Sequence, residues 1–345
     1  MPACARRCLI DRKRVQVVHC ISRCVRRAYL CGKDLRTGTD YGHRREWIRQ
    51  LLEELAAFFA IEIGFYSVMQ NHLHLVLRSR PDVARRWPKE KVVRCWLKVA
   101  KLKRGSSRFD WEPAPELVHS EMKDARRVKR LRRRLGNVSW FMGALAENIS
   151  RRANADDGCT GHFWEQRFKA RDLVDIGAVL VAGVYVDLNP IRSGVTLTPE
   201  DSRYTSAYDR IASYRQKQAG LRASPKGIGS WRTPDCWLCE FTLQEHLQSN
   251  EGDDAMNQTP WRASKKGLLP ISLEDYLKLL DWTGRQVREH DRGVIPSDLA
   301  PILDRIEIGR ENWLTTIREY DSRFGRVVGR FEQRADSKTT TEPNS

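Results

Sequence analysis

The sequence predicts an α+β fold in which two histidines lie on an inner strand of the sheet. Three observations lead to this prediction. Residues 15–22 are apolar and β-branched, the composition of a buried strand. Residues 43–60 repeat apolar side chains at helical spacing. Residues 61–68 and 72–77 then form two strand-like runs separated by a polar turn. Strand, helix, strand, strand is typical of a compact α+β domain.

The second of these runs carries a His-x-His pattern, because His72 and His74 flank Leu73. Side chains alternate faces along a strand, so both imidazoles project from one side with their Cα atoms about 6.7 Å apart. That spacing lets them converge on one metal ion or face a phosphate. The alternative is a histidine pair on a half-exposed strand face with no ligand. His19, on the first strand, is expected to be a core or rim residue.

The charge balance favours a nucleic acid as partner. The 345 residues include 61 Lys and Arg against 44 Asp and Glu, a net charge of +17. An anionic membrane surface is the second possibility. However, the longest apolar run, residues 176–186, is shorter than the roughly 20 residues of a spanning helix. The first residues have no apolar segment long enough for a signal peptide. We therefore expect no membrane association and a cytoplasmic, nucleoid-associated location.

The nine cysteines are odd in number and scattered, which predicts reduced thiols rather than a disulfide framework. Cys236 and Cys239 form one CxxC pair. Because no second pair follows at zinc-ribbon spacing, buried thiols are favoured over a zinc site there.

The middle of the chain contains its densest basic run. Residues 81–111 predict one helix and a loop, and residues 123–134 a helix with a thin apolar stripe at Val128 and Leu131. Such a run is either a solvated surface or a site that neutralises phosphates, and the latter fits the net charge better. The candidate DNA-binding residues in it are Lys123, Arg126, Arg127, Lys129, Arg130, Arg132, Arg133 and Arg134. Residues 140–149 predict a further helix, capped by Asn137 or Ser139.

Residues 161–171 interleave aromatic and basic side chains, a mixture that suits stacking on unpaired bases and pairing with phosphates. The candidates are Trp164, Arg167, Lys169 and Arg171. The alternative is a loop whose aromatic rings pack inward.

Residues 176–188 predict a helix that ends before Pro190, which places Tyr185 and Asn189 on one face of its last turn. By themselves these two residues are typical of a core tyrosine and a helix cap.

Beyond Gly194 the composition loosens. Residues 215–235 and 249–270 predict linkers, and residues 281–293 a turn. Three further helices are predicted at residues 272–280, 299–308 and 313–324, followed by a polar, disordered tail from 335 to 345.

Four ordered blocks, VMQNHLHLVL, NVSWFMGALAENISRRAN, GHFWEQRFKAR and YVDLNPIRSG, resemble the REP-associated tyrosine transposases, a branch of the single-tyrosine HUH transposases. The similarity runs from about residue 15 to 206 and extends less distinctly to SLEDYLKLLDWTGR. It implies a ferredoxin-like α+β HUH domain with a central antiparallel sheet and flanking helices, plus a C-terminal helical region. The predicted division is a catalytic domain at 1–206, an irregular linker at 207–270, a helical accessory region at 271–334 with DNA binding as one candidate role, and the tail.

The resemblance also implies residue roles. His72 and His74 would be metal ligands with Asn189 as the third, and Tyr185 would be the nucleophile. These ligands are neutral, so a bound Mg²⁺ or Mn²⁺ would stay strongly cationic. The implied activity is cleavage and rejoining of single-stranded or hairpin DNA at palindromic repeats through a 5′-phosphotyrosine, without ATP, by a monomer or homodimer. No acidic residue is obviously placed to act as general base.

Two alternatives are open. A DNA-binding regulator that keeps the fold would need the basic residues but not the histidines, so its hairpin affinity would survive His72→Ala. A replication-initiator or relaxase-like nickase usually comes with a helicase or with a second tyrosine in the motif, whereas residue 184 is Val. Gln70 also departs from the Pro or Ser that the family often carries in that turn.

Overall fold

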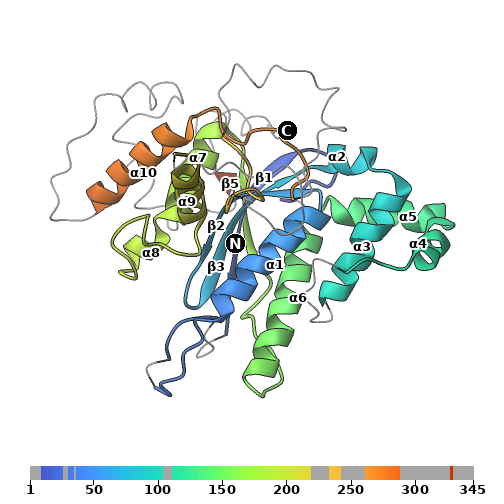
Figure 1. Ribbon diagram of the computed structural model, residues 1–345, viewed down its shortest axis with the longest axis horizontal. Coiled ribbons are helices and arrows are strands. Elements are labelled where there is room, and N and C mark those ends of the chain that lie inside the picture. Colours follow the sequence, from blue (N-terminus) through green and yellow to red (C-terminus); the bar gives the residue numbers. More distant parts are fainter. Residues whose placement is uncertain are drawn as a thin grey trace, which may run out of the picture.

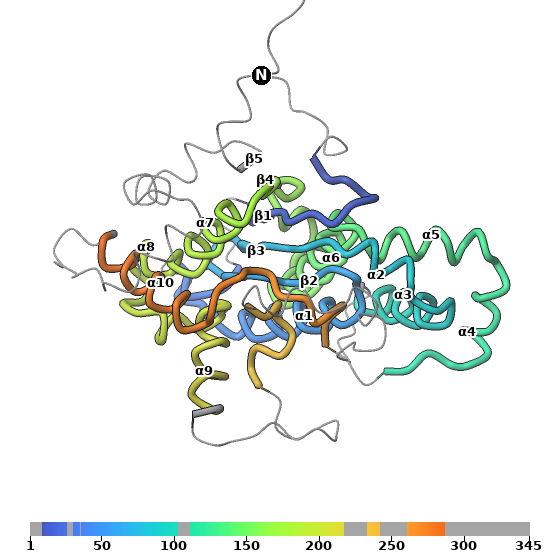
Figure 2. The backbone as a smooth tube through the Cα atoms, turned by 90° about the horizontal axis from the view of Figure 1, so that it is seen from above, coloured from blue at the N-terminus to red at the C-terminus, as the bar shows by residue number. Residues whose placement is uncertain are grey.

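A twisted sheet with the strand order β2-β3-β1-β4-β5 forms the centre of the protein (Figures 1 and 2). The computed structural model describes residues 9–25, 30–34, 36–103, 111–218, 233–241, 261–287 and 327–328. The strands are β1 (Gln16–Arg23), β2 (Ile61–Val68), β3 (His72–Ser79), β4 (Lys169–Leu173) and β5 (Val327–Val328). The first four pair antiparallel, and β5 adds a short parallel pairing to β4.

The order of elements confirms the predicted fold class. Helix α1 (Arg44–Phe58) connects β1 to β2, and α6 (Val138–Asp156) precedes β4. This β-α-β-β-α-β arrangement, with β3 and β1 in the middle of the sheet, is ferredoxin-like. The histidine strand β3 is an inner strand, as predicted, since it lies between β2 and β1.

Both faces of the sheet are covered. On one face, α1 and α6 pack over Leu73, Leu75 and Leu77 of β3 in one apolar core. On the other face, Phe65 and Val76 meet helices α7 (Ile176–Asp187) and α10 (Leu273–Val287) in a second core (Figure 1). Residues at alternate positions of β3 therefore enter different cores, and the side of β3 that carries the histidines faces α7.

A group of helices is inserted between β3 and α6: α2 (Pro81–Arg86), α3 (Lys89–Lys103), α4 (Pro115–Met122) and α5 (Ala125–Leu135). The prediction of one helix and a loop over residues 81–111 is wrong in the number of helices, because α2 and α3 are separate. Trp87 is extended at ψ 137°, the conformation that the following Pro88 favours. Asn137 caps α6 by accepting from Ser139 N and Trp140 N, which confirms one of the two predicted caps.

Among the described residues past 194, regular structure is more extensive than the composition indicates. After the short α8 (Asn189–Arg192), helix α9 (Ser206–Gln218) lies within the segment predicted to be irregular. Trp237 is fully buried against Tyr66, with ring centroids 5.1 Å apart. The turn predicted at 281–293 is wrong in its first half, because α10 continues to Val287.

The helices predicted at 299–308 and 313–324 and the tail at 335–345 lie outside the described residues. The domain boundaries at 206 and 270 stay predictions. The cysteines that the structure describes are free, as expected. Within the described part of the chain, no helix has the length and apolarity needed to cross a membrane.

Candidate active site at the histidine end of the sheet

Strand β3 brings His72 and His74 to one side of the sheet, as their spacing predicts. Their rings are nearly perpendicular, with centroids 4.7 Å apart. His74 is buried, at 2% exposure, whereas His72, at the start of the strand, is half-buried. The pair therefore lies where the face covered by α7 opens toward solvent.

Helix α7 places Tyr185 next to this histidine pair. Asp175 is the N-cap of this helix, and its side chain accepts from Ala178 N at 2.7 Å. Tyr185 is 3% exposed, and its ring centroid lies 5.5 Å from that of His74. The tyrosine is thus a core residue by burial, and it also faces the histidines.

Asn189 reaches the same place from the start of α8. Its Nδ2 atom lies 3.4 Å from His74 Nε2. Helix α7 ends at Asp187 rather than just before Pro190, and a new turn begins at Asn189. Pro190 sits in the first turn of α8, where its missing N–H removes no hydrogen bond. The structure thus brings Tyr185 and Asn189 together around His74, although they lie on two helices rather than one.

Asp187 anchors the end of α7 that carries Tyr185. Its carboxylate is fully buried and accepts from Tyr276 Oη of α10 at 2.7 Å and from Ala207 N of α9 at 3.0 Å. Ser206 Oγ is a further donor. Burial raises the pKa of Asp187, and these donors oppose that rise. Three helices therefore meet at one residue, two positions from the tyrosine.

His19 is a member of the cluster that sequence reasoning missed. It is fully buried on β1, and its Nε2 atom lies 3.1 Å from Nδ1 of His74. The two rings stack with centroids 5.3 Å apart, and the Tyr185 ring is 6.0 Å away. His19 pairs with Val76 rather than with either histidine. Only the register of β1 against β3 shows that it reaches His74, and the sequence of β1 alone does not contain that register.

Positive charge surrounds the cluster. Arg171 of β4 pairs with His19 across the sheet, and the Arg192 guanidinium lies 5.0 Å from the Tyr185 ring centroid. Burial, together with the charges of His19, His72 and the two arginines, lowers the pKa of His74 well below its usual range. His74 is therefore neutral at neutral pH and keeps a nitrogen lone pair.

The side chains gathered here are of types that could hold a divalent ion. The Asn189 atom nearest His74 Nε2 is the amide nitrogen Nδ2, at 3.4 Å, so the amide would have to turn over to offer its oxygen to an ion shared with His74. Imidazole nitrogens and an amide oxygen are ligands that Mn²⁺ accepts. Among the described residues, no group of three or more His, Cys, Asp or Glu side chains could hold a metal. An ion here would take its remaining ligands from Asn189, a phosphate and water.

The aromatic and basic segment packs on the α6 face of the sheet, opposite the face that carries the histidines, and Phe163 and Phe168 are buried in the core there. Trp164 and Arg167 line a groove of about 710 Å³ between α6 and residues 161–168. Trp164 Nε1 donates to Ala146 O of α6 at 2.9 Å, which fixes one wall. Ser22 also lines the groove, and the next residue, Arg23, pairs with His72. The groove therefore lies near the His72 end of β3, but on the face of the sheet opposite the histidines. Lys169 is exposed on β4.

The basic run of α5 is elsewhere. Helix α5 packs against α2 and α3, which follow the Ser79 end of β3, whereas His72 begins that strand (Figure 1). Three of its cations serve the fold. Arg132 donates to the carbonyls of Ala84, Arg85 and Trp87, Arg127 pairs with Glu121, and Arg134 stacks on Trp96 and Trp140. The exposed cations among the candidates at 123–134 are Lys123, Arg126, Lys129, Arg130 and Arg133.

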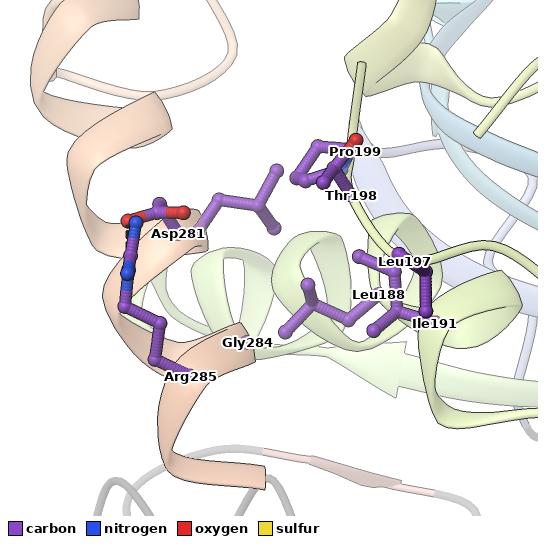
Figure 3. Close-up of a pocket in the computed structure, with 9 residues that line it drawn as sticks. Leu188, Ile191, Leu197, Thr198, Pro199, Asp281, Gly284 and Arg285 are labelled. Atoms are coloured by element: carbon purple, nitrogen blue, oxygen red, sulfur yellow. Dashed lines mark hydrogen bonds and ion pairs between the residues drawn. The ribbon is translucent and has the colours of Figure 1, made fainter. Parts of the chain in front are cut away.

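A smaller cavity of about 210 Å³ separates α10 from α8 and the loop that follows it (Figure 3). Leu188 and Ile191 line one side, and Gly284 with the ion-paired Asp281 and Arg285 the other. It contains none of the residues that the sequence singles out for function.

Comparison with known proteins adds little. No family model matches the chain, and no curated protein matches it. A solved structure described as a REP-associated tyrosine transposase bound to a REP hairpin is similar over 63% of this chain and 91% of its own, at 10% identity and a TM-score of 0.29. Similarity at this level does not assign a function.

Proposed function

We propose that the protein is a metal-dependent single-strand DNA endonuclease and strand transferase that acts on hairpin or palindromic repeat DNA. One observation carries the proposal. Tyr185, a nucleophile type, lies 5.5 Å, centroid to centroid, from His74, which in turn lies beside His72 and within 3.4 Å of Asn189. These neutral side chains are all potential metal ligands, and they lie around a tyrosine with two arginines nearby. A purely structural role would not require this combination.

The chemistry follows from these residues. His72, His74 and Asn189 would hold Mg²⁺ or Mn²⁺, which when bound polarises the scissile phosphate. Tyr185 Oη attacks the phosphorus as its proton passes to solvent. The bond to the 3′-oxygen breaks, and that oxygen takes up a proton. The products are a 5′-phosphotyrosine and a free 3′-hydroxyl. A second 3′-hydroxyl reverses the step and joins two strands, so no ATP is needed.

The surroundings support a DNA substrate. Arg171 and Arg192 place positive charge where the phosphate would gain negative charge. Trp164 and Arg167 line a groove on the α6 face of the sheet, and an aromatic ring beside a guanidinium suits unpaired bases and their phosphates. The exposed cations of α5 lie toward the Ser79 end of β3, where they suit phosphates of a duplex stem.

A covalent-adduct assay tests the proposal. A labelled hairpin oligonucleotide with single-stranded flanks is incubated with protein and Mn²⁺, with and without EDTA. We expect a denaturation-resistant adduct for the wild type, none for Tyr185→Phe and none in EDTA. Tyr214→Phe is the matched control, because its hydroxyl donates to Glu274 outside the cluster, and it should form the adduct normally. Tight hairpin binding with no adduct under any metal would instead support the non-catalytic regulator.

A further inference from the structure

We propose that His19 is a positioning residue that holds His74 in the tautomer able to bind a metal ion. The inference rests on the proposed function. In neutral imidazole one ring nitrogen carries the proton and the other has the lone pair. A metal binds the lone pair, so the proton on His74 has to be on the other nitrogen. The hydrogen-bond partners of His74 determine where that proton lies.

His72 also has a hydrogen-bond partner that determines which of its ring nitrogens is protonated. His72 Nδ1 lies 2.7 Å from Asn71 Oδ1. A carboxamide oxygen only accepts, so His72 donates from Nδ1 and its lone pair is on Nε2. Asn71 therefore fixes the tautomer of His72 from the preceding residue.

For His74 the corresponding partner is His19. Its Nε2 atom lies 3.1 Å from His74 Nδ1, and Asn189 Nδ2, which only donates, lies 3.4 Å from His74 Nε2. If His74 carried its proton on Nε2, two donors would face each other across that contact. With the proton on Nδ1, His74 donates to His19 and accepts from Asn189, and each of these atoms has a complementary partner.

Burial makes the loss of the His19–His74 hydrogen bond costly. His19 is fully buried and His74 is 2% exposed, so water does not replace a lost bond at low cost. The stacking of the two rings, 5.3 Å between centroids, also restricts rotation of the His74 ring. Hydrogen bonds of this kind to the second nitrogen of a metal-binding histidine typically contribute 10–100-fold to metal affinity.

The test combines a tautomer measurement with metal affinity and uses the full-length protein. Nitrogen-15 NMR of metal-free protein, with His74 assigned by comparison with His74→Ala, reports which ring nitrogen is protonated. Calorimetry then gives the Mn²⁺ dissociation constant of the wild type, of His19→Leu, which removes the acceptor, and of His19→Gln, which keeps one. We expect Nδ1–H on His74 in the wild type, about 10–100-fold weaker Mn²⁺ binding in His19→Leu, and largely restored binding in His19→Gln.

Two results would overturn this role. One is a wild-type NMR spectrum that shows the His74 proton on Nε2. This measurement needs no variant, so a folding defect of His19→Leu would not affect it. The other is a folded His19→Leu that binds Mn²⁺ as tightly as the wild type. Failure of the proposed function looks different: a wild type with Nδ1–H on His74 that binds Mn²⁺ yet forms no DNA adduct contradicts the nuclease and leaves the role of His19 intact.

Discussion

Gly183 of α7 lies directly over the ring of Phe65 in β2, so closely that a Cβ atom at residue 183 would come within 2.4 Å of Phe65 Cζ. The contact lets the backbone of α7 approach the sheet, and Tyr185 follows two residues later. The depth at which the tyrosine faces His74 is therefore set by a glycine that carries no functional group.

Replacing this glycine should separate the helix from the sheet. We expect Gly183→Ala to lower the free energy of unfolding by about 1–3 kcal/mol, because an added methyl group overpacks the core, and to reduce adduct formation. Urea denaturation measures the first effect. Gly143→Ala in α6 is the matched control, since no atom lies within 4 Å of its Cβ position. It should be neutral or up to about 1 kcal/mol more stable. Equal effects of the two substitutions would refute the close-approach explanation.

The buried carboxylate of Asp209 should make stability depend on pH. It accepts from Tyr66 Oη at 2.8 Å and pairs with Arg49 at 3.2 Å, yet burial outweighs these partners and raises its pKa from 3.8 to about 6. A raised carboxyl pKa stabilises the fold below pH 3.8, and this stabilisation is lost as the pH rises through 6.

Relative to Asp209→Asn, which cannot ionise, the wild type should therefore lose up to about 3 kcal/mol between pH 4 and pH 7. Denaturation of both proteins across this range gives the difference. A wild type that instead gains stability relative to the variant would mean that the ion pair with Arg49 outweighs burial.

The exposed cations of α5 should contribute to DNA affinity through phosphates alone. Arg126, Arg130 and Arg133 are exposed, whereas Arg132 is bound to backbone carbonyls of α2 and the residue after it. Replacing the three exposed arginines with Gln should weaken hairpin binding and reduce the slope of log affinity against log salt by about 3. Arg132→Gln is the contrast: it should lower stability and change the slope by no more than about 1. An unchanged slope in the triple variant would place the DNA elsewhere.

The sequence predicted the elements whose periodicity is strong and missed what depends on pairing between distant strands. The histidine strand and the helix of Tyr185 follow from local patterns, since alternation and apolar length are visible in residues 72–77 and 176–188. His19 could not be placed, because its contact with His74 depends on the register of β1 against β3.

The region after residue 206 shows the same limit. Trp237 packs on Tyr66 and Tyr276 donates to Asp187, each through one side chain in a segment of mixed composition. No local pattern reports such single contacts. The basic run of α5 was evident from its composition. Which of its cations are exposed and which bind within the fold depends on how α2 and α3 pack against it, and the composition does not show that packing.

The most direct test of the account identifies the residue that carries the DNA. Wild-type adduct formed on the hairpin with Mn²⁺ is digested with a nuclease and then with trypsin, and the modified peptide is sequenced by tandem mass spectrometry. We predict a nucleotide attached through a 5′-phosphate to Tyr185. A nucleotide on any other residue, or an unmodified Tyr185 in a reaction that has cleaved the DNA, would contradict the proposed mechanism.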